Sequence, residues 1–451
     1  MAPGDLAASD PPYPSPRIAW IVVALLLLVY ASSFVDRQVM GLLVMPIRAD
    51  LHISDFQFSL LTGLAFALFY AVLGLPIARL VDRGDRRVIL SIGVVTWSIF
   101  TLLCGRATSF ATLFLARTGV GVGEATLVPC TYSLLADYFP AQRRGVAMGI
   151  FGSGVYLGMG GALVLGGAVW RALAHVDGLV IGPLGHFSPW QLVFVLVGAP
   201  GFILAALLLL VWEPRRQRRA AASEPVPESR SGLLSIWREG YLALLGHHLA
   251  AGFLAMALYG VATWAPEHLR RAFDVEVSVG GYAVGVSVMV SGTCGVVIAG
   301  LLSDWLLRKG IAAARLVVLA GASVFSCPCL LLFSSAASLT LALVWLSGSV
   351  FFLSMLTCCG PLGVQELYPP RLRGQGAAIF QFLVTLLGLG GGPAIIAAVS
   401  DFVLHPAHQL GPAMGITTPI LVLAAGVAAL AGMSSYGRAV GHAATFARAP
   451  T

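Results

Sequence analysis

Charged residues are scarce in this sequence. Asp, Glu, Lys and Arg make up 10% of its 451 residues, whereas 58% are hydrophobic, and a typical soluble domain carries about a quarter charged residues. This scarcity excludes an ordinary water-soluble globular protein. Long polar stretches are few as well. Apolar runs of about 20 residues recur along the chain instead. Each is long enough to cross a hydrocarbon core of about 30 Å as a helix. We therefore expect a polytopic membrane protein.

Motifs of enzymes, primary pumps and metalloproteins are also missing. The sequence contains no nucleotide-binding motif and no catalytic triad, so we predict a protein that is not an enzyme and uses no cofactor. All seven cysteines fall inside apolar runs, and no His or carboxylate stands beside the close pairs at 327–329 and 358–359. We therefore expect no metal site. Because the cations are spread over several short loops, nucleic acid is not an expected partner.

Twelve apolar runs have the length of membrane-spanning helices. They cover about residues 18–46, 56–81, 88–105, 110–138, 145–171, 190–212, 240–268, 278–307, 312–334, 338–367, 375–401 and 416–436. Residues 1–16 are polar and Pro-rich, and the first run is too long for the apolar region of a signal peptide, so no cleavable signal is expected.

Basic residues are divided unevenly between the loops. With twelve spans, most Lys and Arg fall on one side of the membrane, and the other side receives Arg48, Arg106, Arg171, Arg270 and Arg271. By the positive-inside rule, both termini are expected in the cytoplasm. The predicted location is the cytoplasmic (inner) membrane, if the source is bacterial.

Two segments of the first half recur in the second half. The stretch ARLVDRGDRR at 78–87 recurs as GLLSDWLLRK at 300–309, which matches Asp82 with Asp304, Arg86 with Arg308 and Arg87 with Lys309. The stretch DYFPAQRRGVAMGIF at 137–151 recurs as ELYPPRLRGQGAAIF at 366–380. Both repeats map a loop of one half onto the equivalent loop of the other, which indicates a duplicated six-helix architecture.

The longest polar stretch, residues 214–239, lies between the two halves and is rich in Ser, Pro, Glu and Arg. Such a composition is typical of a linker. We therefore expect five regions: a cytoplasmic tail (1–17), a six-helix bundle (18–213), a cytoplasmic linker (214–239), a second six-helix bundle (240–437) and a cytoplasmic tail (438–451).

The repeated loop motif resembles the signature of the major facilitator superfamily. That resemblance implies an all-α membrane protein with twelve transmembrane helices in two pseudo-symmetric six-helix bundles. The segments RTGVGVGEATLVPCTYSLLADYFPAQRRG (117–145), FVDRQVM (34–40) and TWAPEHL (263–269) resemble the spinster family. Members of that family move lysophospholipids or sphingosine-type lipids, which implies a lipid substrate here. The resemblance also implies that Asp36 and Arg37, with Arg117 and Glu124, are the functional core.

Spacing alone places the same charged residues together. Arg117 and Glu124 are seven residues apart, hence on nearly the same face of one helix and about 10 Å apart along its axis. Asp36 belongs at a depth between them, and Arg37 points about 100° away around its helix, toward a different partner. Charges inside a span are costly, so they normally face a cavity and one another. A static network that fixes helix packing is the alternative interpretation.

We expect Asp36 and Glu124 to carry a coupling proton, because a helix movement that changes the neighbours of a carboxylate can load or release a proton. The second half has no acid or base near a helix midpoint and offers large apolar side chains instead. A charged half opposite an apolar half suits a substrate with a polar head and a long tail. The predicted substrate-binding residues are Arg37, Arg117, Tyr259, Trp264 and Phe380.

The loop after the second expected span resembles the cytoplasmic gate of the superfamily. In that gate, an Asp meets the positive end of a helix of the other half and holds the cytoplasmic side shut. The resemblance assigns this role to Asp82, Arg86 and Arg87, with Asp304 as the repeat. Topology-setting charge explains some of the arginines but not the two acids.

The leading hypothesis is a monomeric secondary transporter that works by alternating access and moves an amphipathic lipid with proton coupling. Its partners would be the lipid-like substrate, protons and the surrounding membrane lipids. One alternative is a transporter of the same fold for a small organic anion or drug, anchored by Arg37 and Arg117. A non-transporting receptor is a third hypothesis, although the chain has no large soluble appendage that would favour it.

Overall fold

The computed structural model describes residues 13–173, 178–180, 186–214, 230–369, 372–404 and 409–448. Within them, the first half consists of α1 (Pro16–Gln38), the 3₁₀ helix η1 (Val39–Leu42), α2 (Val44–Leu51), α3 (Asp55–Thr62), α4 (Leu64–Arg83), α5 (Arg86–Cys104), α6 (Phe110–Glu124), α7 (Leu127–Tyr138), α8 (Ala141–Leu173), α9 (Pro189–Gly198) and α10 (Pro200–Leu209). Between α8 and α9, β1 (Leu179–Val180) pairs antiparallel with β2 (His186–Phe187), so that Leu179 lies opposite Phe187.

The described residues of the second half form helices joined by short loops, with no strand among them. It consists of α11 (Arg230–Phe273), α12 (Val277–Arg308), α13 (Ala314–Ser334), α14 (Leu339–Leu353), α15 (Leu356–Leu367), α16 (Arg373–Leu383), the π-helix η3 (Val384–Gly391), α17 (Gly392–Ala398), the π-helix η4 (Val399–Val403) and α18 (Leu410–Arg448). The backbone of α11 is kinked at Gly240, where φ is −110° and ψ is 17°.

Local sequence sets where several helices begin. Ser54 and Ser109 each open a helix with a reciprocal capping box, closed by Gln57 and Thr112. At the start of α9, the side chain of Gln191 accepts a hydrogen bond from the backbone N–H of Ser188. Asp85 caps α5 by accepting hydrogen bonds from the backbone N–H groups of Arg87 and Val88. These side chains satisfy N–H groups that have no partner within the helix.

The described residues contain eleven helical stretches that are long and apolar enough to cross a membrane. Each corresponds to an expected span. The remaining expected span, 110–138, is divided into α6 and α7, which are separated by Ala125 and Thr126. Pro129 follows directly in α7, where it cannot donate the hydrogen bond that would continue one helix. The corresponding span of the second half is divided in the same way, into α14 and α15.

Helices extend past two of the expected region boundaries. α11 begins at Arg230, inside the expected linker 214–239, and its kink at Gly240 coincides with the expected start of the second bundle. Residues 215–229 lie outside the described residues. The expected tail from residue 438 is helical as far as Arg448. The side chains of Glu239 and His442 contact each other, so the two helical extensions support one another through a contact between distant parts of the sequence.

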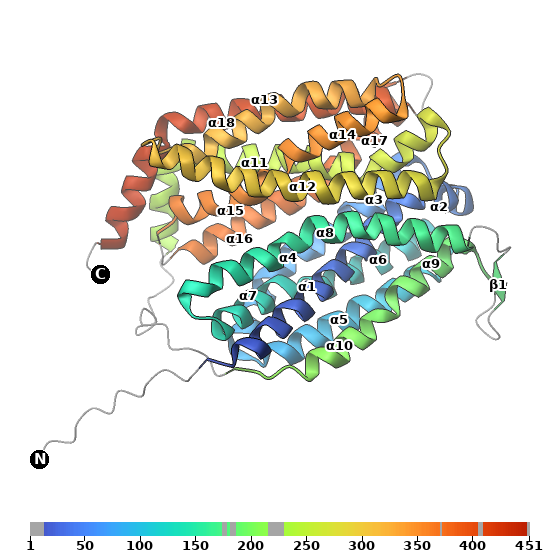
Figure 1. Ribbon diagram of the computed structural model, residues 1–451, viewed down its shortest axis with the longest axis horizontal. Coiled ribbons are helices and arrows are strands. Elements are labelled where there is room, and N and C mark those ends of the chain that lie inside the picture. Colours follow the sequence, from blue (N-terminus) through green and yellow to red (C-terminus); the bar gives the residue numbers. More distant parts are fainter. Residues whose placement is uncertain are drawn as a thin grey trace, which may run out of the picture.

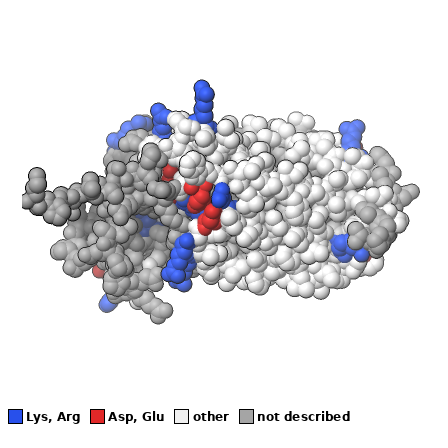
Figure 2. Space-filling model, turned by 90° about the horizontal axis from the view of Figure 1, so that it is seen from below, with Lys and Arg blue, Asp and Glu red and all other residues white. Residues whose placement is uncertain are grey.

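The two six-helix halves lie side by side, and the start of α1 and the end of α18 lie at the same end of the molecule (Figure 1). We call this end the terminal end. The opposite end, which contains α2, α3 and the β-hairpin, is called the distal end. On the face drawn in Figure 2, charged side chains gather toward the two ends and leave a broad uncharged band between them. That distribution is the one expected for helices surrounded by lipid.

The interface between the halves is formed in large part by α8 and α12, which run alongside each other (Figure 1). A Cβ atom on Gly160 would collide with the carbonyl oxygen of Gly285, and a Cβ on Gly285 would lie 2.6 Å from that of Gly160. These glycines therefore let the two backbones touch. Nearer the terminal end of α8, Gly149 and Gly152 face open space.

Hydrogen bonds confirm the internal repeat of the sequence. Arg144 donates to the carbonyl oxygens of Ala136 (2.7 Å) and Phe139 (3.3 Å) at the end of α7. Arg373 donates to those of Gln365 (3.1 Å) and Tyr368 (3.4 Å) at the end of α15. The two arginines occupy matching positions of the second repeat, so the duplication extends to the capping of helix ends.

Candidate functional site

A buried ion pair joins α1 to α6 in the first half. The guanidinium of Arg37 donates through Nε to Glu124 Oε2 at 2.7 Å, and its Nη2 contacts the same oxygen. The side chain of Glu124 is fully buried and that of Arg37 is 9% exposed. Burying both charges is costly, and removal of either partner would leave the charge of the other uncompensated away from water.

Aromatic rings surround the Arg37 guanidinium. Its Cζ lies 4.4 Å from the centre of the Phe66 ring, 4.9 Å from that of Phe34 and 5.5 Å from that of Tyr70. A delocalised cation is attracted to the faces of such rings, most strongly where water is excluded. The rings therefore hold the Arg37 side chain in the position where it meets Glu124.

Asp36 and Arg117 form the second part of the cluster. Arg117 Nη1 donates to the backbone carbonyl of Asp36 at 3.0 Å, and its Nε lies 3.5 Å from the carbonyl of Leu61. Both side chains are buried. Three atoms of the cluster make no hydrogen bond: Asp36 Oδ1, Arg117 Nη2 and Glu124 Oε1. A buried polar atom without a partner is costly, so these atoms are suited to bind a proton or a polar group of a substrate.

The structure brings together the four charged residues that were expected to form one cluster. Arg37 was expected to point about 100° away from Asp36 and to engage a different partner, and it pairs with Glu124. Arg117, seven residues before Glu124 on α6, lies at another depth and reaches the carbonyls of Asp36 and Leu61 instead. The proton-coupling and substrate-binding roles of these residues stay predictions.

The aromatic residues predicted to bind substrate lie in three different environments. Trp264 is buried, donates to the carbonyl of Pro393 at 3.0 Å and packs against Phe58 of the first half. Phe380 is buried against the rings of His247 and His248. Tyr259 is partly exposed. In this conformation Trp264 and Phe380 are packing residues, so they would reach a substrate only after the helices move.

The predicted gate residues have partners within their own halves. Arg86 is fully buried and binds Asp137, Glu213 (2.6 Å) and the carbonyl of Pro214 (3.0 Å). Arg87 donates to Asp85 (3.1 Å). The side chain of Asp82 lies outside the part that the structure describes.

Asp304, the predicted repeat of Asp82, accepts from Arg315 at 3.2 Å. Arg315 also donates to Glu366 at 3.1 Å. Arg86 begins α5 and binds Asp137 at the end of α7. Its structural equivalent is Arg315, which lies at the start of α13 and binds Glu366 at the end of α15. The sequence-based match of Arg86 with Arg308 is therefore wrong. Arg308 is exposed at the end of α12.

An ionic cluster at the distal end was not predicted as a functional site. The fully buried carboxylate of Asp55 in α3 binds Arg48 at 2.7 Å and, from the other half, Arg271 at 2.9 Å and 3.0 Å. Arg271 also binds Glu267 at 2.5 Å. The backbone N–H of Phe56 donates to Asp401 of the second half at 2.8 Å. The sequence shows that these charged residues lie at the ends of apolar runs, but it does not show which of them form ion pairs.

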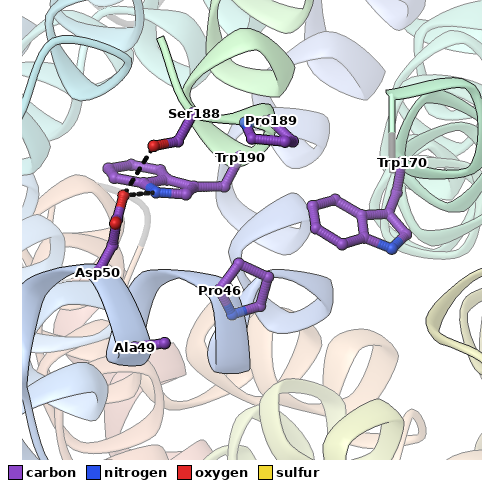
Figure 3. A pocket seen from close by; sticks show the side chains of 7 residues that line it. All are labelled: Pro46, Ala49, Asp50, Trp170, Ser188, Pro189 and Trp190. Atoms are coloured by element: carbon purple, nitrogen blue, oxygen red, sulfur yellow. Dashed lines mark hydrogen bonds between the residues drawn. The ribbon is translucent and has the colours of Figure 1, made fainter. Parts of the chain in front are cut away.

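A pocket of about 320 Å³ opens at the distal end of the first half (Figure 3). It is lined by Pro46, Ala49, Asp50, Trp170, Ser188, Pro189 and Trp190. Asp50 Oδ2 accepts hydrogen bonds from Ser188 Oγ at 2.9 Å and Trp190 Nε1 at 2.6 Å, which ties α2 to the start of α9 (Figure 3). None of the predicted site residues lines this pocket.

Comparisons with known proteins identify a family and several relatives. The family model of the Major Facilitator Superfamily matches residues 26–393. An MFS-type efflux pump from Mycolicibacterium smegmatis is 28% identical over 395 residues, which cover 86% of this chain and 85% of that protein. A probable galactarate/D-glucarate transporter from Bacillus subtilis is 26% identical over 409 residues, with 83% and 84% coverage.

One solved structure is similar over almost the whole chain. It is that of a bacterial homolog of the human lysosomal transporter spinster, in an inward-facing and unoccupied conformation. The sequence identity is 26%, the TM-score is 0.74, and the match covers 97% of this chain and 100% of that chain. The likeness thus includes both six-helix halves.

Proposed function

The chain belongs to the Major Facilitator Superfamily, and from this premise we propose that it moves an amphipathic lipid across the membrane by alternating access with proton coupling. Family membership confirms the predicted all-α membrane fold, and the chain is a multi-pass secondary transporter, not an enzyme. The proposed substrate is a lysophospholipid or a sphingosine-type lipid. The likeness to a spinster homolog supports this class, since residues 34–40, 117–145 and 263–269 resemble the spinster family.

The observation that carries the proposal is the buried charged cluster of the first half. Arg37 and Glu124 form an ion pair, while Asp36 Oδ1, Glu124 Oε1 and Arg117 Nη2 have no partner. Among the described residues of the second half, the acids and bases lie toward the helix ends and the central positions are apolar or weakly polar. A cluster of this kind can bind a polar head group and a proton, and the apolar half can bind a hydrocarbon tail.

The contacts between the halves support alternating access. Arg271 with Asp55 and Asp401 with the N–H of Phe56 join the halves at the distal end, and Tyr156 with Thr357 joins them nearer the middle at 2.7 Å. Toward the terminal end, Gly149 and Gly152 of α8 face open space. Given the excess of basic residues at the terminal end, we propose that this end is cytoplasmic. The conformation would then be closed to the outside.

A second function is supported by one of the relatives. A protein named as a probable galactarate/D-glucarate transporter matches 83% of this chain. The free Nη2 of Arg117 is a buried cationic donor, and arginine suits carboxylate recognition. A small organic anion held by Arg117 and Arg37 is therefore the alternative substrate.

Flux measurements on purified protein in liposomes test these two functions against each other. We expect uptake of fluorescent lysophosphatidylcholine or fluorescent sphingosine that increases when a pH gradient is imposed. Radiolabelled D-glucarate, measured in the same vesicles, represents the alternative. Transport of D-glucarate without transport of either lipid would replace the lipid proposal by the anion proposal.

Three variants separate coupling from binding. Asp36→Asn and Glu124→Gln should abolish the effect of the pH gradient and leave the protein folded, because each removes a titrating group but little volume. Arg117→Ala should weaken both lipid binding and coupling, since it removes the cation that meets the head group and lies near both acids. Full gradient-driven transport in both carboxylate variants would reduce the cluster to a static packing network.

A further inference from the structure

The spacing along α6 places a glycine between the two charged residues of that helix. Gly121 follows Arg117 by four residues and precedes Glu124 by three, so all three lie on one face. A Cβ atom on Gly121 would lie 2.6 Å from the carbonyl oxygen of Phe66. The backbone of α4 therefore contacts α6 directly between Arg117 and Glu124.

The side chain of Phe66 lies close to both buried arginines. Its ring centre is 4.4 Å from the Cζ of Arg37 and 6.0 Å from the Cζ of Arg117. The ring of Tyr70 stacks on it with a centre-to-centre distance of 5.3 Å and an angle of 25° between the planes. Phe66 is fully buried, so neighbours on several sides fix the position of its ring.

Phe66 lies near two charged side chains of α6, Arg117 and Glu124, each of which has a polar atom without a partner. Arg117 Nη2 and Glu124 Oε1 are buried and make no hydrogen bond, although opposite charges in a dry interior attract each other strongly. We infer that Phe66 is a positioning residue, a partition whose ring keeps Arg117 away from Glu124, so that Arg37 and not Arg117 pairs with this carboxylate.

This inference rests on the proposed role of Glu124 as a proton-binding group. A carboxylate with one cationic partner binds a proton more readily than one with two, because each nearby cation favours the ionised form. The charged and titratable groups that interact with Glu124 are Arg37 and Asp36 on α1, Arg117 on α6 and Tyr70 on α4. By keeping the second arginine out of hydrogen-bond contact with Glu124, the partition would let Glu124 accept a proton more readily during transport.

Infrared titration of the purified protein in lipid tests the partition. The C=O stretching band of a protonated carboxyl group is recorded against pH, and the portion that disappears in Glu124→Gln belongs to Glu124. In Phe66→Leu, we expect the midpoint of this band to move to lower pH by about one unit, a tenfold weaker proton affinity, because Arg117 can then reach Glu124. Phe66→Met serves the same purpose if the Leu variant does not fold.

Phe34→Leu is the matched control. The ring of Phe34 lies 4.9 Å from Arg37, so its removal takes away a contact of Arg37 without opening a path for Arg117. We expect its midpoint to match that of the unaltered protein. In the double variant Phe66→Leu with Arg117→Gln, the midpoint should return toward the original value.

The partition is overturned if the Phe66 variants titrate like the unaltered protein, if Phe34→Leu shifts the midpoint equally, or if no band of Glu124 titrates while the protein is folded. The measurement needs no transport. A protein that moves no lipid but shows the shift would therefore refute the proposed function and leave the partition standing.

Discussion

The ionic cluster at the distal end offers a direct test of how the two halves are held together. Asp55→Asn removes the charge that Arg271 of the second half contacts through two hydrogen bonds of 2.9 Å and 3.0 Å. Arg48 lies in the same half as Asp55, so that contact is retained when the halves separate and does not affect the equilibrium. The bond from Phe56 to Asp401 also remains. The variant should therefore weaken distal closure without abolishing it.

The size of the effect follows from the contacts of Arg271. Hydrogen bonds to charged groups contribute about 1.5 to 3 kcal/mol each, but Arg271 is 17% exposed and keeps its ion pair with Glu267. We therefore expect a loss of about 2 kcal/mol in the free energy of distal closure, less than the sum of about 3 to 6 kcal/mol for two such bonds, because solvent screens Arg271 and Glu267 still compensates its charge. At 1.4 kcal/mol per factor of ten, this is a shift of about 30-fold toward the distally open conformation.

Double electron–electron resonance measures the distances between spin labels and therefore the population of the distally open conformation. Labels on cysteines placed at Ala49 and Ala272, which are exposed near the distal end of each half, would report the opening in a background whose native cysteines are replaced. Asp50→Asn is the control, because Asp50 binds Ser188 and Trp190 of its own half (Figure 3). Identical distance distributions for Asp55→Asn and Asp50→Asn would refute the view that Asp55 closes the distal end.

Three further outcomes follow from the fold. Arg144→Ala and Arg373→Ala should each lower the free energy of unfolding by about 1 kcal/mol, because each leaves helix-end carbonyls uncapped. The two variants should therefore lower the calorimetric unfolding temperature by similar amounts, and a several-fold difference between these decreases would contradict equivalent roles. Gly160→Val should separate α8 from α12 at Gly285 and reduce the transport rate, whereas unchanged transport would show that this close approach is dispensable. Asp82→Asn should favour opening of the terminal end by about 1 kcal/mol, and spin-label distances across that end would not change if Asp82 has no gating role.

The sequence alone was sufficient to predict the spans and the duplication. Lipid cannot satisfy backbone hydrogen bonds, so an apolar run of the right length has to be a helix wherever it lies in the chain. Local rules act in the same way, and Arg144 and Arg373 cap equivalent helix ends because their positions relative to those ends are the same. The grouping of Asp36, Glu124 and Arg117 could also be predicted, since depth in the membrane follows from counting residues along a helix.

Pairing between elements was decided only by the tertiary structure. Counting along the chain matched Arg86 with Arg308, but α12 continues to Arg308, and the residue that enters the next helix and meets the acid at the end of α15 is Arg315. Likewise, Arg37 pairs with Glu124 because three aromatic rings direct its guanidinium. Distances of a few ångströms between side chains of different helices determine ion pairs, and hydropathy contains no information about them.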